Sequence, residues 1–175
     1  MQLKVIADIG IIGLPNAGKS SLLASITKAR PKIASYPFTT LNPNLGVSYY
    51  DDKEITLADI PGLVEGAHRG VGLGDKFLRH IERCKLLLHI VDLSENDLLE
   101  NYLKVRNELS SYDDILSKKK EIIFFNKSDL VEKKDMDKKL KIFKDKIKKK
   151  FEVISVFSEK DLLKIKKVLL KNVIK

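Results

Sequence analysis

One short run of residues limits the possible folds of this chain more than any other feature. Residues 13–20 read Gly-Leu-Pro-Asn-Ala-Gly-Lys-Ser and fit the pattern G-x-x-x-x-G-K-[ST]. The apolar segment 7–12 before them predicts a buried strand, and the segment 19–27 after them predicts a helix with one apolar face. Strand, glycine-rich loop and helix in this order form a loop that can hold a polyphosphate, because backbone N–H groups and the helix N-terminus face the phosphates.

Side chains within this loop have distinct expected roles. Lys19 would reach the β- and γ-phosphates as a point charge, and the Ser20 hydroxyl would ligate Mg²⁺. The nucleotide-binding residues expected here are Gly13, Leu14, Pro15, Asn16, Ala17, Gly18, Lys19, Ser20 and Ser21.

Length and composition limit the kind of protein. We expect the 175 residues, 1–175, to form a single domain that is long enough to bury a core. Cys84 is the only cysteine, so an internal disulfide is excluded, and we expect the thiol to serve packing. No apolar run approaches the ~18 residues of a membrane span, and no signal peptide is evident. We therefore expect a cytoplasmic location.

The net charge of +9 is unevenly spread. Residues 118–175 hold 20 Lys and Arg against 9 Asp and Glu, whereas residues 1–117 hold 13 against 15. This basic third could be a face for RNA or the ribosome. The alternative is a solvated lysine-rich helix face, which the lysines within 138–150 resemble, and the absence of Arg among them argues against nucleic-acid contact. Both interpretations stay open.

Continuously apolar strands alternate with helices along the chain. The expected strands are 7–12, 46–50, 54–59, 85–92, 121–126 and 151–156, and the expected helices are 19–27, 76–83, 96–116, 134–150 and 161–174. Residues 46–59 read as a β-hairpin with a tight turn at 51–53. The pattern predicts an α/β three-layer sandwich of the P-loop NTPase kind, with a mostly parallel six-stranded sheet and one antiparallel strand.

A second phosphate-side motif follows the strand 54–59. The segment is Asp59-Ile60-Pro61-Gly62, in which the carboxylate would hold a Mg²⁺-bound water and the Gly62 N–H would lie near the γ-phosphate. Alone, this segment would read as an ordinary strand-ending turn. Combined with the phosphate loop, it favours a nucleotide site.

The third motif, residues 126–129, follows the apolar strand 121–126 and predicts the choice of base. The Asp129 carboxylate can accept from both N1–H and the exocyclic amine of guanine, a donor pair that adenine lacks. Asn126 would brace the neighbouring loops and meet the base edge, and the Lys127 stem would cover the base face. Residues Ser155, Val156 and Phe157, after the last strand, lie where a backbone N–H would meet the guanine carbonyl.

These four elements, in this order, resemble the translation-factor class of GTPases, and their details resemble the Obg family. The resemblance covers nearly the whole chain and weakens after about residue 131. It is carried by Gly-Leu-Pro-Asn-Ala-Gly-Lys-Ser at 13–20, Tyr-Pro-Phe-Thr-Thr-Leu at 36–41, Asp-Ile-Pro-Gly-Leu-Val-Glu-Gly-Ala at 59–67, Gly-Leu-Gly at 72–74 and Phe-Leu-Arg-His-Ile-Glu-Arg at 77–83.

The resemblance implies a ribosome-associated GTPase that acts in large-subunit assembly and stress response. It also implies a loop, with Phe38, Thr39 and Thr40, that contacts the nucleotide, with Thr40 rather than Thr39 as the second protein ligand of Mg²⁺. Asn16 resembles the Asn that helps hold K⁺ beside the phosphates in potassium-stimulated relatives. Full-length members carry a Gly-rich N-terminal domain and often a C-terminal domain, so we expect this chain to be the GTPase domain alone, and a monomer.

Several positions depart from the expected patterns. The family usually has Ser-Ala where this chain has Ser155-Val156, and glycines where Glu159 and Asp161 stand. Ras-type enzymes place a water-orienting Gln directly after D-x-x-G, where this chain has Leu63. Glu65 is our candidate for the catalytic group, and a solvated loop carboxylate is the alternative. We assign no chemistry to the three histidines, which are His68, His80 and His89.

Three functions fit these observations. The first is a GTPase switch in which GTP orders residues 33–42 and 59–74 and hydrolysis releases them. The second is an ATPase, because a cousin family shares the Gly-Leu-Pro-Asn loop; Asn126 and Asp129 argue against it. The third is a nucleotide-gated RNA- or ribosome-binding module with incidental hydrolysis. This function stays possible because Leu63 cannot orient the attacking water.

Overall fold

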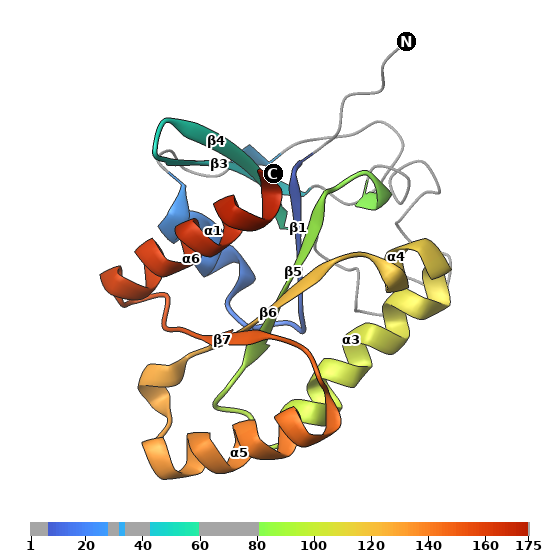
Figure 1. Cartoon of the computed structure of the whole chain (residues 1–175), viewed down its shortest axis with the longest axis vertical. Coiled ribbons are helices and arrows are strands. Elements are labelled where there is room, and N and C mark those ends of the chain that lie inside the picture. The colour runs from blue at the N-terminus through green and yellow to red at the C-terminus, as the bar shows by residue number, and fades with distance from the viewer. Residues whose placement is uncertain (1–6, 28–31, 34–42, 60–80, 175) are drawn as a thin grey trace.

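Seven strands form one sheet in the computed structural model, which describes residues 7–27, 32–33, 43–59 and 81–174 (Figure 1). The strand order is β2-β3-β4-β1-β5-β6-β7. The strands are β1 Ile9–Ile12, β2 Lys32–Ile33, β3 Asn44–Tyr50, β4 Lys53–Asp59, β5 Leu86–Asp92, β6 Glu121–Asn126 and β7 Phe151–Val153. The helices are α1 Lys19–Ile26, α3 Leu98–Tyr112, α4 Asp114–Lys118, the 3₁₀ turn η2 Ser128–Leu130, α5 Lys133–Lys146 and α6 Glu159–Val173.

The predicted fold class is confirmed. β1 pairs in parallel with β4 and β5, and β6 pairs in parallel with β5 and β7, so β3 is the antiparallel member of the six expected strands. A two-residue strand, β2, adds to the outer edge by pairing antiparallel with β3. The β3–β4 turn consists of Asp51 and Asp52, whose φ angles of 52° and 57° are those of a two-residue type I′ turn.

Helices cover both faces of the sheet, as Figure 1 shows for α1 and α6 on one side and for α3, α4 and α5 on the other. On the first face, Leu22 of α1 and Ile165 of α6 pack with Ile9 and Leu88 of the sheet. On the other face, Val105 and Leu116 pack on Leu87, and Phe143 of α5 packs beside Phe125. Met136 and Leu140 of α5, and Ile147 directly after it, pack around the same cluster as Phe143.

The single helix predicted at 96–116 is wrong, because Asp113 divides it. The backbone of Asp113 is extended, with φ −162° and ψ 136°, and its N–H closes α3 by donating to the carbonyl of Leu109. Its carboxylate then accepts from the N–H of Ile115 at 2.7 Å and starts α4. Asp97 caps α3 in the same way, through the N–H of Glu100. Two capping aspartates therefore set the helix boundaries.

Other boundaries also differ from the predictions. β7 ends at Val153 rather than at 156, because the N–H of Val156 bonds to the Asn126 side chain instead of to a strand partner. α5 ends at Lys146 rather than at 150. Most of the predicted helix 76–83 lies outside the described residues. Within the described residues, no helix has the length and apolar character needed to cross a membrane.

Candidate functional site

The predicted motifs meet at one edge of the sheet, where the parallel strands have their carboxyl ends. The phosphate loop follows β1, Asp59 ends β4, Asn126 ends β6, and Ser155 follows β7. Ligands of open α/β sheets bind at this edge. Seven predicted site residues lie outside the described residues, and their roles stay predictions: Phe38, Thr39, Thr40, Ile60, Pro61, Gly62 and Glu65.

Two glycines of the phosphate loop have no room for a side chain. Gly13 has φ 154°, and a Cβ there would lie 2.4 Å from the carbonyl oxygen of Ile90. Gly18 has φ 102°, and a Cβ there would lie 2.2 Å from Nδ2 of Asn126. Asn16 also has a left-handed backbone, with φ 62°. The loop therefore turns sharply while it lies against two neighbouring strands, as a backbone phosphate cradle requires.

Lys19 folds back over this loop. Its ammonium donates to the carbonyl oxygens of Gly13 at 2.9 Å and Leu14 at 3.0 Å. The same residue begins α1, whose N-cap, Gly18, supplies no capping side chain. A cation above the loop and a helix N-terminus below it both favour a bound anion.

Ser20 and Asp59 face each other across the loop. The Ser20 hydroxyl donates to Oδ2 of Asp59 at 2.7 Å, and Asp59 is only 3% exposed. Oδ1 of Asp59 is buried and has no hydrogen-bond partner among the described residues. One hydroxyl beside one carboxylate oxygen fits a hard cation that takes its other ligands from water and phosphate, as Mg²⁺ does. The described residues contain no cluster of three or more His, Cys, Asp or Glu that could hold a metal by itself.

Asn126 joins three loops of the site. Its Nδ2 donates to the carbonyl of Ala17 in the phosphate loop at 3.1 Å, and its Oδ1 accepts from the N–H of Val156 at 3.3 Å. The side chain is almost fully buried, so both bonds are made away from solvent. The predicted bracing of neighbouring loops by Asn126 is therefore observed, whereas its contact with a base stays a prediction.

The side chain of Lys127 is held by a residue that the sequence analysis missed. Lys127 has a left-handed backbone with φ 68°, and its ammonium forms an ion pair with Asp92 at the end of β5. Burial by itself would raise the pKa of Asp92, but hydrogen bonds from Lys127 and Ser94 bring it below its ordinary value. Asp92 is therefore ionised at neutral pH and fixes the direction of the Lys127 stem. Its position at the end of an apolar strand, next to the strand of Asn126, was the available signal.

Asp129 and Phe157 are exposed residues of the two loops that follow β6 and β7, whereas Ser155 and Val156 are buried. Asp129 is exposed, and its side chain makes no hydrogen bond with any residue that the structure describes. The N–H of Ser128 donates to the carbonyl of Ile154 at 3.2 Å, which holds the two loops side by side. Phe157 is 84% exposed. The side chain of Asp129 thus stays available to a ligand beside an exposed ring.

Asp161 restrains the last loop at a position where the Obg resemblance leads us to expect glycine. Its carboxylate accepts from the N–H of Ser155 at 2.9 Å, and its own N–H donates to Ser158, the N-cap of α6. The N–H of Phe157 donates to the Ser155 hydroxyl at 3.3 Å. Of the N–H groups in residues 155–157, that of Phe157 has a long bond within its own loop and would be exchanged for a ligand most easily, whereas that of Val156 is held by Asn126.

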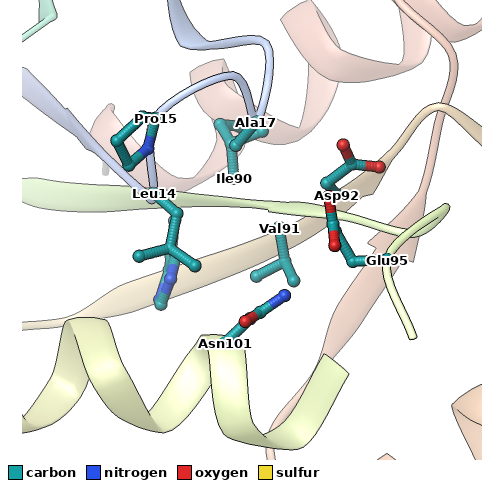
Figure 2. Close-up of a pocket in the computed structure, with 9 residues that line it drawn as sticks. Leu14, Pro15, Ala17, Ile90, Val91, Asp92, Glu95 and Asn101 are labelled. Atoms are coloured by element: carbon teal, nitrogen blue, oxygen red, sulfur yellow. The ribbon is translucent and has the colours of Figure 1, made fainter. Parts of the chain in front are cut away.

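A cavity of about 220 Å³ separates the phosphate loop from α3. Figure 2 shows Leu14 of the loop, Val91 of β5 and Asn101 of α3 around this space. Asp92 and Glu95 lie at its other end. Leu14 packs against the core cluster that contains Ile12 and Leu87, while Pro15 is exposed at the rim of the cavity.

The described histidine and the cysteine both belong to the core. His89 is completely buried, stacks on Tyr102 and bonds through Nδ1 to Glu121 at 2.8 Å. Burial lowers the pKa of His89, so the ring is neutral at pH 7 and Nδ1 donates to the carboxylate. Burial raises the pKa of the Cys84 thiol to about 11, which leaves it protonated. This agrees with the packing role expected for Cys84. His68 and His80 lie outside the described residues.

Fold and site together define a P-loop GTPase domain. Residues 8–127 match the family model described as a 50S ribosome-binding GTPase. Two solved structures share the fold. The G domain of the T. maritima FeoB iron transporter has a TM-score of 0.62 over 94% of this chain and 96% of that one. Aquifex aeolicus Era bound to GDP·AlF4⁻ has a TM-score of 0.66 over 94% of this chain and 56% of that one. Both are only 22% identical to this chain, so they support the fold alone.

The chain belongs to the Obg family of GTPases. It is 60% identical to the GTPase Obg of Pelagibacter ubique over 173 residues, which cover 99% of this chain and 53% of that protein. It is 51% identical to the Rickettsia felis GTPase Obg over 99% of this chain and 52% of that protein, and 55% identical to the Ehrlichia canis GTPase Obg over 89% and 46%. The chain spans about half the length of these curated relatives.

Proposed function

We propose that this domain binds GTP with Mg²⁺, hydrolyses it slowly and acts as a molecular switch. The observation that carries the proposal is the position of Asn126, whose one side chain bonds to the phosphate loop and to the loop after β7. A guanine held by Asp129 would then lie at a fixed distance from phosphates held by residues 13–20. Membership of the Obg family supports the same function.

Each part of the site has a separate task in this proposal. The loop backbone and Lys19 hold the β- and γ-phosphates, with Lys19 exchanging its two carbonyl partners for phosphate oxygens. Asp129 accepts from the guanine edge, while the Lys127 stem, fixed by Asp92, covers one face of the base. The exposed ring of Phe157 lies where it can pack against the base as well.

Ser20 and Thr40 would be the protein ligands of Mg²⁺, and Asp59 would hold a metal-bound water. When bound, Mg²⁺ neutralises charge that develops on the phosphates. Ser20 would give up its hydrogen bond to Asp59, which frees Oδ2 beside Oδ1, an atom with no hydrogen-bond partner in the described part of the chain. The buried carboxylate is then compensated by the hydrated cation rather than by one hydroxyl.

Slow hydrolysis follows from the residue after D-x-x-G. Leu63 has no group that could orient the attacking water, so the intrinsic rate should resemble that of a switch without its activator. Glu65 is the residue we assign to water positioning. Segments 33–42 and 59–74 would order around the γ-phosphate and relax after its release.

The cellular role that we propose is assembly of the large ribosomal subunit and stress response, in the cytoplasm, with the domain acting as a monomer. The family description, 50S ribosome-binding GTPase, supports a ribosomal partner. A second candidate is a nucleotide-gated RNA-binding module with incidental hydrolysis, which the absence of a water-orienting side chain at Leu63 favours. Turnover that rises many-fold with ribosomal subunits would select the switch over this module.

A comparison of nucleotide affinities tests the proposed activity. Titration calorimetry with GTP, GDP and ATP, with and without Mg²⁺, should give tight binding of both guanine nucleotides and weak binding of ATP. In Lys19→Ala, the loss of one charge-assisted contact should weaken GTP by about ten- to a hundredfold. Equal affinity for ATP and GTP, or a Lys19→Ala variant within a factor of two of the parent, would contradict the proposal.

A further inference from the structure

A lysine-lined groove lies at the edge of the sheet opposite the nucleotide site. One hollow of about 570 Å³ lies between the first residues of β6 and β7 and the last turns of α6. A second hollow, of about 500 Å³, shares residues 149–152 with it and extends to the end of α5. The lysines that line this basic groove are Lys120, Lys144, Lys148, Lys149, Lys150 and Lys171, and all six are exposed.

Carboxylates do little to balance this charge. Glu121 and Glu152 are the acidic residues that line the two hollows. The Glu121 side chain is only 1% exposed and already accepts from His89, Tyr102 and Lys149. Glu152 is paired with Lys164. The groove is therefore strongly positive on its open side.

Helix dipoles explain only part of the lysine cluster. Lys144 lies in the last turn of α5 and Lys171 in the last turn of α6, where a cation balances the negative end of the helix. Residues 148–150 and Lys120 lie outside the helices and directly before β7 and β6. Lys120 still contacts the end of α6, because its ammonium donates to the carbonyl oxygen of Asn172 at 3.5 Å. The lysines at 148–150 lie beyond the last turn of α5, and Lys148 and Lys150 form no ion pair with any described residue.

We propose that the basic groove binds the phosphate backbone of an RNA strand. A concave surface with ammonium groups on both walls can follow a polyanion, and each contact releases condensed counterions. The aromatic lining of the groove is limited to Phe151, which is only partly exposed, so bases would not stack there and binding would be independent of sequence. This inference rests on the proposed ribosomal function for the source of the RNA, but not on nucleotide hydrolysis.

The position of the groove has a consequence for regulation. Lys120 and Lys150 precede the amino ends of β6 and β7, whereas Asn126 ends β6 and Ser155 follows the carboxyl end of β7. RNA on the groove and nucleotide on the other edge would occupy opposite ends of the same strands. RNA affinity through this groove should therefore be nearly the same with GDP and with a GTP analogue.

Fluorescence anisotropy with a short fluorescein-labelled single-stranded RNA tests the proposal. The variant carries Lys148→Gln, Lys150→Gln and Lys171→Gln, and it keeps Lys149 because that side chain supports the buried Glu121. We expect at least a tenfold loss of affinity near 0.15 M salt, and a slope of log K against log[salt] that is smaller by about 2. The matched control replaces the exposed lysines Lys53, Lys134 and Lys160 with Gln, which removes the same charge away from the groove.

Two results would overturn the proposal. The first is an equal loss of RNA affinity in both triple variants, which would mean a general effect of charge. The second is a parent protein that binds phosphatidylglycerol vesicles but does not bind RNA. Circular dichroism and GDP affinity should be the same in both variants. If the parent protein bound RNA through the groove but did not bind GTP, the proposed GTPase function would be wrong and the proposal that the groove binds RNA would still hold.

Discussion

Nδ2 of Asn126 lies 3.1 Å from the carbonyl oxygen of Ala17, a residue 109 positions earlier in the chain. This bond joins the strand-end loop after β6 to the phosphate loop after β1, although β5 lies between those strands in the sheet. The other end of the same amide accepts from Val156, after β7. One buried side chain thus sets the relative positions of the loops proposed to hold phosphate and base.

Asn126→Ala should therefore weaken both stability and nucleotide binding. The substitution leaves the Ala17 carbonyl and the Val156 N–H without their partner in a buried place, which costs about 1–3 kcal/mol of unfolding free energy. GDP affinity should fall by at least about tenfold, because the two loops lose their common support. Urea unfolding and calorimetric titration measure the two effects. Asn107→Ala, at an exposed position on α3, is the control and should change neither.

Asn126→Asp tests the two hydrogen bonds of the Asn126 side chain separately. The carboxylate can still accept from Val156, but it has no donor for Ala17 and places negative charge beside that carbonyl. Nucleotide affinity should fall at least as far as in Asn126→Ala. A variant that keeps the parent affinity would show that the bond to the phosphate loop is not what positions the site.

Asp129→Asn should change the choice of base without changing the fold. Asp129 is exposed, and no described residue bonds to its side chain, so unfolding by urea should be unaffected. The amide cannot accept from both guanine donors, but it can donate to the oxygen at C2 of xanthine. GTP should weaken by at least about tenfold while XTP gains, because unpaired polar groups reject the wrong base. Competition against a fluorescent GDP analogue measures this, and an unchanged preference for GTP would remove Asp129 as the specificity residue.

Much of the site could be predicted because its parts are local. The phosphate loop, Asp59 and residues 126–129 each combine a short motif with the strand before it, and parallel strands bring their carboxyl ends to one edge. The three layers and the antiparallel β3 follow from alternating strands and helices with one tight hairpin. These features depend on residues close together in the chain, so the sequence pattern contains them.

The remaining features depend on side-chain contacts that the apolar pattern does not describe, and most of these contacts join distant residues. Asp92 appeared as the last residue of an apolar strand, and its ion pair with Lys127 spans 35 positions. The sequence pattern gives no chemistry for His89, yet this residue is completely buried against Glu121, 32 positions away. The break at Asp113 was missed because the apolar pattern continues through it, with Leu109 and Leu116 both buried, while a local capping bond ends the helix. Burial and ion pairing are decided by tertiary geometry and helix capping by a local polar contact, and the periodicity of apolar residues describes none of these.

The Glu121 cluster predicts how stability depends on pH. Although burial alone would raise the pKa of Glu121, hydrogen bonds from His89 and Lys149 and the nearby Arg106 lower it from 4.5 to about 2. The contribution of Glu121 to the free energy of unfolding is therefore fully present above about pH 4.5 and is lost as the pH falls toward 2. This contribution is on the order of 3 kcal/mol. Burial lowers the pKa of His89 below 6.5, so as the pH falls the unfolded chain is protonated at this residue before the folded protein is. The free energy of unfolding therefore also starts to decrease below pH 6.5.

Glu121→Gln should destabilise the protein at pH 7, because Lys149 and Arg106 lose their buried partner carboxylate. It should also flatten the decline in unfolding free energy between about pH 4.5 and pH 2. Urea unfolding at a series of pH values measures both effects. Glu100→Gln is the matched control, since it removes only an exposed pair with Lys104. If the free energy of unfolding falls equally with decreasing pH in Glu121→Gln and in the parent, Glu121 is not the source of the decline.

Asn16 is the residue on which the proposed role of K⁺ depends. It is exposed at the turn of the phosphate loop, with φ 62°, so its side chain is available beside the phosphates. A K⁺ held there against the β- and γ-phosphates would offset charge that develops in the transition state, as an arginine finger does. Because Leu63 cannot orient water, turnover in Na⁺ should be near the intrinsic Ras-like range of about 10⁻⁴–10⁻³ s⁻¹. Single-turnover hydrolysis in K⁺ should be faster than in Na⁺.

Asn16→Ala should abolish the difference between K⁺ and Na⁺ while GDP affinity stays nearly the same, because Lys19 and the loop backbone still hold the phosphates. The left-handed backbone at this position disfavours Ala, so Asn16→Gly, which tolerates φ 62°, serves as the second variant. If the parent hydrolyses GTP equally fast in both salts, Asn16 does not bind a catalytic cation. Fast turnover in Na⁺ alone would instead mean that another side chain positions the water, and Glu65→Gln would then be the variant that decides whether this group is Glu65.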